Sequence, residues 1–236
     1  LMFNTLIILY LFLGGFGAGT FALTIILGWL PTSWFGICNP HNDRQRRSLH
    51  EKIGLTVALG ALGIGIVALC LDLGSRAFKF YFALNNLGTS WLSNGALSLA
   101  LLAALGLVLL LHKTDFFSLP NSLIMATKIA GLLTALFVMF YTGAFLYSMG
   151  NAIPRWNTLT LPLLFCLSSL SCGIAAHELI AAYYQMPDQC GIKRFLNRSE
   201  VAILALELIV AILFAWLSYG SQFFPEPVAK SAPFGA

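Results

Sequence analysis

The sequence predicts an all-α membrane protein, a polytopic transmembrane helix bundle of about six spans. The 236 residues are 58% hydrophobic and only 9% charged, whereas ordinary soluble domains carry about 25% charged residues. The apolar residues also fall into six runs, each long enough to cross a hydrocarbon core of about 30 Å as a helix. Trp and Tyr gather near the ends of these runs, as in an interfacial aromatic belt.

The predicted spans cover residues 3–30, 53–71, 90–111, 123–148, 159–184 and 200–219. We predict one domain, a helical bundle over residues 1–220. The Pro-rich residues 221–236 lack a core of their own and form an external tail. The sequence opens without a basic segment or a small-residue cleavage site, so we expect no signal peptide.

The distribution of basic residues predicts the orientation of the spans. The first, third and fifth loops carry eight Lys and Arg residues, whereas the second and fourth loops and the tail carry four. Under the positive-inside rule the odd loops lie in the cytoplasm and both termini outside. Because the positive charge is confined to short loops, we expect contacts with membrane lipid and no nucleic-acid binding.

Small residues mark two helix faces. In the first span, Gly15 and Gly19 form a small-xxx-small motif, which allows helix backbones to approach closely in lipid. Tyr10 shares one face of that helix with Gly14 and Gly17. We therefore expect its hydroxyl to point into the bundle, although an interfacial position would also explain a tyrosine there.

One candidate site lies at the outer ends of the spans, where Tyr10, Asp72, Arg76 and Tyr141 fall at one depth. Hydroxyl and carboxylate groups above apolar helices would suit an amphipathic ligand with a polar head. In the alternative, Asp72 and Arg76 cap their helix and reach the headgroups.

A second polar set lies in the inner half and consists of Lys128, His177, Glu178 and Glu207. Ser169 and Gly173 precede His177 at intervals of four, so His177 is expected to be buried. Intramembrane Glu and His residues often form proton relays. The alternative is a His–Glu pair that satisfies itself, with Lys128 reaching to the membrane surface.

We expect neither haem nor a metal ion in this protein. The five cysteines form no C-x-x-C pair, so an iron–sulfur cluster or a structural zinc is not indicated. Haem in a helix bundle needs two opposed histidines within spans. His177 is the intramembrane histidine, whereas His112 ends a span and His41 and His50 are predicted to lie in a loop.

Several short motifs occur in an order that resembles the NrfD/polysulfide-reductase membrane-subunit family. They are Tyr10–Gly19 (YLFLGGFGAG), Leu71–Arg76 (LDLGSR), Ser90–Ser93 (SWLS), Tyr141–Gly143 (YTG), Asn157–Phe165 (NTLTLPLLF) and Ser168–Gly173 (SSLSCG). The likeness extends over about three quarters of the sequence. Ala77 stands where the family usually has a proline, and many members have eight or more spans.

The resemblance implies a haem-free quinol-binding subunit of a respiratory oxidoreductase in the bacterial inner membrane. It implies electron exchange between menaquinone and a ferredoxin-like partner with four iron–sulfur clusters, itself attached to a molybdopterin-type catalytic subunit. By matching motifs, the quinone site falls on Tyr10, Asp72 and Tyr141, with Asp72 and Tyr141 in the chemistry. Arg76 and Trp91 would border this site or the docking surface of the partner.

Two other functions remain as alternatives. A small secondary transporter would bind a coupling ion at its midplane acids, but such proteins commonly show internal repeats and interrupted helices, and the two halves show no clear repeat. A structural membrane anchor without quinone chemistry would tolerate replacement of Tyr10, Asp72 and Tyr141.

Overall fold

Six helices make up the protein in the computed structural model, which describes residues 5–30, 40–73, 91–114, 116, 119–148, 158–184 and 191–223. The helices are α1 (Thr5–Trp29), α2 (Pro40–Leu73), α4 (Trp91–Lys113), α5 (Asn121–Ser148), α6 (Thr160–Tyr183) and α7 (Gly191–Phe223). No strand occurs within these ranges. All six helices are long and apolar enough to cross a membrane, which confirms the predicted fold: this is a multi-pass membrane protein.

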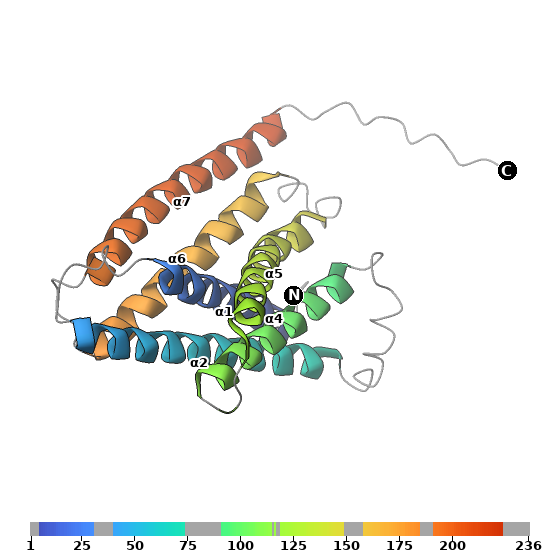
Figure 1. The fold of residues 1–236 in the computed structure, drawn as a ribbon. Coiled ribbons are helices and arrows are strands. Elements are labelled where there is room, and N and C mark those ends of the chain that lie inside the picture. Colours follow the sequence, from blue (N-terminus) through green and yellow to red (C-terminus); the bar gives the residue numbers. More distant parts are fainter. Residues whose placement is uncertain are drawn as a thin grey trace.

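Helix α1 is the centre of the bundle, in contact with α2, α5 and α6, while α4 packs on α2 and α5. Helix α7 lies at the edge, next to α6 (Figure 1). The largest side chains of the core come from four helices and include Phe21, Leu62, Leu102 and Met139, each fully buried. Near the first turns of α7, Leu196 packs against α1 and α6.

The crossing of α1 and α6 depends on glycine. A Cβ atom at Gly19 would overlap the backbone carbonyl of Ser169, and one at Gly173 would lie 2.6 Å from the carbonyl carbon of Gly19. A Cβ at Gly15 would come within 2.7 Å of the Ser169 hydroxyl oxygen. The small-xxx-small motif predicted in the first span therefore contacts the small-residue stripe of the fifth, as expected for close packing in lipid.

Two helices begin earlier than the sequence analysis predicts. Residues 40–52, predicted to be a loop, form the first turns of α2, and α7 begins at Gly191 instead of residue 200. One ion pair within α2 lies at these charged turns: Arg47 and Glu51 are one turn apart, with 3.4 Å between Nε and Oε1. Hydropathy locates the part of a helix that crosses lipid, and it does not locate the helix end.

Arg47 also closes the C-terminus of α1. Its guanidinium donates to the backbone carbonyl oxygens of Leu27 at 3.1 Å and Gly28 at 2.5 Å. The last carbonyls of a helix have no partner within the helix, and a positive charge there interacts favourably with the helix dipole. A charged side chain on α2 thus fixes the end of α1. Of the predicted tail, residues 221–223 belong to α7, and residues 224–236 lie outside the described part of the protein.

Candidate functional site

Two buried tyrosines meet where α1 begins and α5 ends, a region called here the tyrosine end. Tyr10 and Tyr141 are each 2% exposed, although they are far apart in sequence. Their side chains are close enough to interact. Even so, the Tyr141 hydroxyl finds no donor or acceptor in good hydrogen-bonding geometry among the described residues. A buried hydroxyl without a full partner is costly, so a ligand that hydrogen-bonds this oxygen would relieve that cost.

The ring of Tyr141 packs directly against Gly95 on α4. Glycine is needed there, since a Cβ atom at this position would overlap the ring and hydroxyl of Tyr141. Phe137 and Phe145, on the same helix, flank the ring, each with its centroid 6.3 Å away. The phenol therefore occupies a defined position between α4 and the rest of α5.

Asp72 lies at the same end of the bundle. Helix α2 passes the start of α1 at Gly65, where a Cβ would lie 3.7 Å from the Tyr10 carbonyl oxygen. Asp72 follows seven residues later on α2, which is about 10 Å further along the axis. It is half-buried and interacts with another residue.

The opposite end, called here the histidine end, contains a hydrogen-bonded network of side chains. His177 Nδ1 lies 3.0 Å from His50 Nε2, with the two ring centroids 5.0 Å apart. His177 Nε2 lies 3.1 Å from the Thr24 hydroxyl oxygen and 3.2 Å from the Thr20 carbonyl oxygen. His50 is 3% exposed and His177 is fully buried.

The neighbours of the histidines determine their tautomers. The Thr20 carbonyl can only accept, and the Thr24 hydroxyl already donates to it at 2.8 Å. His177 Nε2 is therefore the donor, and for a neutral ring Nδ1 accepts from the N–H of His50 Nε2. His50 Nδ1 is then an acceptor, and it is buried without a partner among the described residues.

Charged groups surround a small cavity beside this network. Glu51 on α2 pairs with Arg47 and with Lys113 of α4. A cavity of about 110 Å³ is lined by Glu51, Lys113, Lys128, His112 and Thr24, among others. The volume suffices for a few water molecules, and the polar lining supplies the partners that buried water needs. Across the described ranges no group of three or more His, Cys, Asp or Glu side chains is arranged to hold a metal ion.

Comparison with known proteins decides the family. The profile of the family described as "Polysulphide reductase, NrfD" matches residues 1–230. This protein belongs to the NrfD family. It is also similar to the C chain of the polysulfide reductase of Wolinella succinogenes, with 28% identity over 247 residues, covering 96% of the present sequence and 73% of that protein. No solved structure matches.

Of the residues that the NrfD resemblance implicated, the structure brings Tyr10 and Tyr141 together and places Asp72 at their end of the bundle. Trp91 is the first residue of α4, and its side chain lies outside the described part. Arg76 also lies outside the described residues. The expectation that the Tyr10 hydroxyl points inward, and not to the interface, agrees with its burial.

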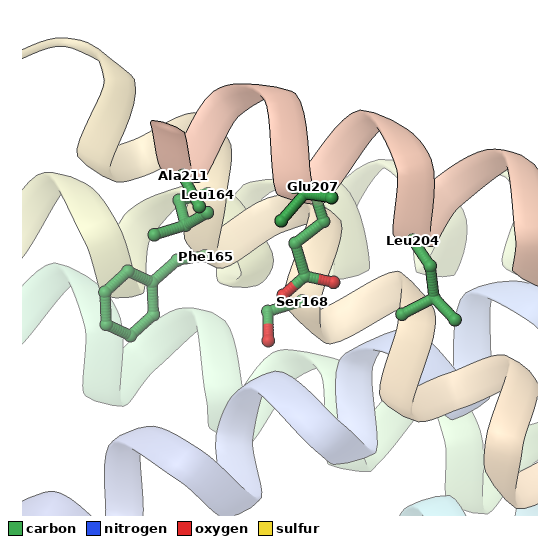
Figure 2. Close-up of a pocket in the computed structure, with 7 residues that line it drawn as sticks. Leu164, Phe165, Ser168, Leu204, Glu207 and Ala211 are labelled. Atoms are coloured by element: carbon green, nitrogen blue, oxygen red, sulfur yellow. The ribbon is translucent and has the colours of Figure 1, made fainter. Parts of the chain in front are cut away.

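The inner polar set of this NrfD protein occupies three different environments. His177 faces the bundle interior, as expected from the stripe of small residues. Glu178 faces α7, where it interacts with Glu200 and Lys193. Glu207 on α7 lines a cavity with Ser168 of α6 (Figure 2). Lys128 lines the separate cavity beside Glu51.

Sequence reasoning missed His50 and Glu51, because both fall in the predicted first loop. The prediction that His50 lies in a loop is wrong: it lies within α2 and is buried. A pattern in the sequence could have placed His50 on a buried helix face, because a residue of this face recurs every four positions: His50, Gly54, Ala58 and Leu62. These residues form the face of α2 that contacts α1 and α6. That spacing continues the apolar face of the helix through the charged turn.

Proposed function

We propose that this protein is the quinol-binding membrane subunit of a respiratory oxidoreductase, and that the tyrosine end holds the head group of menaquinol. The observation that carries the proposal is the buried Tyr141 hydroxyl, which lies near Tyr10 but has no hydrogen bond in good geometry to any described residue. A quinone head presents two oxygens that need donors. Such a head would satisfy the phenol that the protein leaves open.

The residues at the tyrosine end fit the chemistry of the quinol–quinone pair: a bound quinol gives up two electrons and two protons, and a bound quinone takes them up. Tyr10 and Tyr141 can donate to the quinone oxygens through phenolic hydroxyls. Asp72, half-buried at the same end, is the proton acceptor in this proposal. The apolar side chains packed around the two phenols keep the head group in a fixed orientation. Arg76 and Trp91 border the site or the partner in this proposal.

The proposed partners follow from the family and from the name of the relative. That protein is named as one of the chains of a polysulfide reductase, which supports a multi-subunit assembly. We infer a ferredoxin-like iron–sulfur subunit that takes the electrons and a molybdopterin-type subunit that carries the catalytic centre. In this arrangement the present protein needs no haem or metal of its own, because a cluster of the partner docks above the tyrosine end.

The proposed location is the bacterial inner membrane, with the histidine end at the cytoplasm and both termini outside. The excess of Lys and Arg in the odd-numbered loops supports this orientation. Labelling of Cys38 by a membrane-impermeant thiol reagent tests it. We expect labelling only after the cells are opened, and labelling of intact cells would reverse the orientation.

A proton route from the histidine end is the second part of the proposal. The connected side chains of His50, His177 and Thr24 and the polar cavity beside Lys128 support it, because networks of this kind conduct protons in other membrane proteins. Glu178 and Glu207, proposed from the sequence for the same route, lie at the contact between α6 and α7. They would join the network through water.

The test of the proposed site is menaquinol-analogue oxidation by membranes that contain the whole complex. Tyr141→Phe keeps the ring and removes one donor, so turnover should fall about two- to tenfold, the equivalent of one hydrogen bond. Asp72→Asn should lower turnover further, because proton acceptance is lost. Tyr147→Phe, on the same helix but exposed, is the control and should change little.

Immunoblotting of the partner subunits separates loss of chemistry from loss of assembly. If Tyr141→Phe and Asp72→Asn both assemble and turn over at the wild-type rate, the quinol does not bind at the tyrosine end. The structural-anchor alternative would then gain support.

A further inference from the structure

A groove runs along the outside of α6. It consists of two cavities that share Phe165 and Ser168. One, of about 470 Å³, lies between α6 and α7 and is lined by five apolar residues, three of them leucines, together with Ser168 and Glu207. The other, of about 420 Å³, lies between α1, α5 and α6. Each is large enough for part of a drug-sized ligand.

The polar group in this groove lies deep in the membrane. The span of α7 covers Ile192–Ser218, so Glu207 lies about 22 Å from one end and about 16 Å from the other. Its side chain extends from α7 towards Ser168 on α6 (Figure 2). An ionisable group at this depth is expensive, and it marks a functional site by default.

The depth selects the kind of ligand. A phospholipid carries its charged head at the membrane surface. Moving that head to the bilayer centre would cost far more free energy than contacts in the groove could supply. A neutral head with hydroxyl donors can lie at the midplane. Glu207 supplies an acceptor for such a hydroxyl, and Ser168 supplies a second polar group.

The apolar part of the groove fits the tail of the same ligand. The cavity between α1, α5 and α6 is lined by Phe12, Phe16 and Leu11, with only hydroxyls and one thiol as polar side-chain groups. Phe12 and Phe16 stack with centroids 6.5 Å apart, and Phe12 is 60% exposed. A long unsaturated hydrocarbon tail can lie against these rings.

We propose that this groove is a second binding site for a membrane-dissolved hydroquinone, in which the Glu207 carboxyl accepts a hydrogen bond from a ring hydroxyl. The inference rests on the proposed function, since it names the same ligand class. It differs from the tyrosine site in place: Ile8, Phe12 and Gly15 of α1 line the groove, whereas Tyr10 faces the bundle core. Leu11, next to Tyr10 in sequence, lines one end of the groove. A quinol bound in the groove would therefore lie beside the tyrosine site before it moves into that site.

The test is photo-crosslinking with a reduced 1,4-naphthoquinone that carries a diazirine next to the ring and a short isoprenoid tail. The sample is the assembled complex in lipid nanodiscs, and crosslinked peptides are mapped by mass spectrometry. We expect two groups of crosslinks in the wild type, one in α1 and α5 near the tyrosines and one in α6 and α7 near Ser168. A phospholipid with a diazirine in its acyl tail serves as the lipid control.

Three variants assign the crosslinks. Glu207→Gln should reduce the α6–α7 crosslinks about three- to tenfold, because an amide oxygen is a weaker acceptor than a carboxylate. Glu200→Gln makes the same change on the same helix outside the groove and should leave them unchanged. Tyr141→Phe should reduce only the crosslinks near the tyrosines.

The outcomes separate this inference from the proposed function. Crosslinks near the tyrosines alone would overturn the groove site and leave the proposed function standing. Groove crosslinks that persist in Glu207→Gln, or that the phospholipid control gives equally, would show a lipid-filled surface and also overturn the inference. No crosslink at either place would overturn both.

Discussion

The two ends of the bundle satisfy their buried polar groups to different degrees. At the histidine end both ring nitrogens of His177 have partners and the Glu51 carboxylate is shared by Arg47 and Lys113, while His50 Nδ1 lacks a partner among the described residues. At the tyrosine end two phenols are buried, and the Tyr141 hydroxyl lacks a partner in good geometry within the part of the chain that the structure describes. The same helices, α1 and α5, pass through or near both regions.

This difference indicates which end is prepared for a ligand. A network in which most polar atoms are hydrogen-bonded stabilises the fold, and opening it costs the desolvation of those atoms. An unsatisfied hydroxyl lowers the stability of the free protein, and a ligand that hydrogen-bonds to it removes this penalty. The tyrosine end is therefore the better candidate for reversible binding, and the histidine end for holding the helices together and storing or passing protons.

The largest effect should follow from His177→Ala. The change removes a fully buried ring, leaves His50 Nε2 without its partner and creates a cavity between α1, α2 and α6. We expect the free energy of unfolding to fall by about 2–4 kcal/mol, seen as a lower thermal midpoint in detergent. His112→Ala, half-exposed at the end of α4, is the control and should cost much less. Equal losses would show that the histidine network adds no stability of its own.

Gly95→Ala should have the second-largest effect. The new methyl group would overlap the Tyr141 ring, so the phenol must move, at a cost of about 1–3 kcal/mol. We expect menaquinol-analogue turnover to fall about tenfold while the complex still assembles, since each 1.4 kcal/mol corresponds to about that factor. Gly60→Ala is the matched control, because no atom of the described residues lies within 4 Å of a Cβ there. Wild-type turnover in Gly95→Ala would mean that the position of the phenol does not matter.

The sequence predicts the spans and the tyrosine end well, for a physical reason. Apolar runs are set by the membrane thickness, and depth along each span can be counted, so the sequence suffices to assign Tyr10, Asp72 and Tyr141 to one end. Depth alone does not say which way a side chain faces. His177 and Glu178 share a depth, but consecutive residues on a helix point about 100° apart, and the two face different neighbours.

The histidine end was less predictable because its key residues lie in a charged turn. A stretch with Arg46, Arg47, Glu51 and Lys52 has the hydropathy of a loop. It is nevertheless helical, and Arg47 pairs with Glu51 and with the carbonyls at the end of α1. Some of those partners come from other helices, and the sequence of one segment does not reveal them.

A smaller effect is expected for Glu51→Gln. The change leaves Arg47 and Lys113 without their carboxylate partner in a partly buried place. Solvent reaches these cations, so we expect a loss of only about 1–2 kcal/mol in the free energy of unfolding. A double-mutant cycle with Lys113→Met measures the coupling directly. If Glu51→Gln and Lys113→Met are additive, the ion pair contributes nothing and the histidine network alone stabilises this end.

The smallest change in stability should come from Lys128→Met, and for that reason the variant tests the proton route most cleanly. Lys128 lines the polar cavity with Glu51 and Lys113 but is half-exposed, and Met keeps its length and apolar stem. We expect a loss below about 1 kcal/mol. If the cavity feeds protons to the histidine network, turnover should nevertheless fall several-fold while the tyrosine-site crosslinks stay at wild-type intensity, because binding and proton supply are separate steps. Unchanged turnover would show that Lys128 only reaches for the membrane surface, and the histidine end would then be a structural network alone.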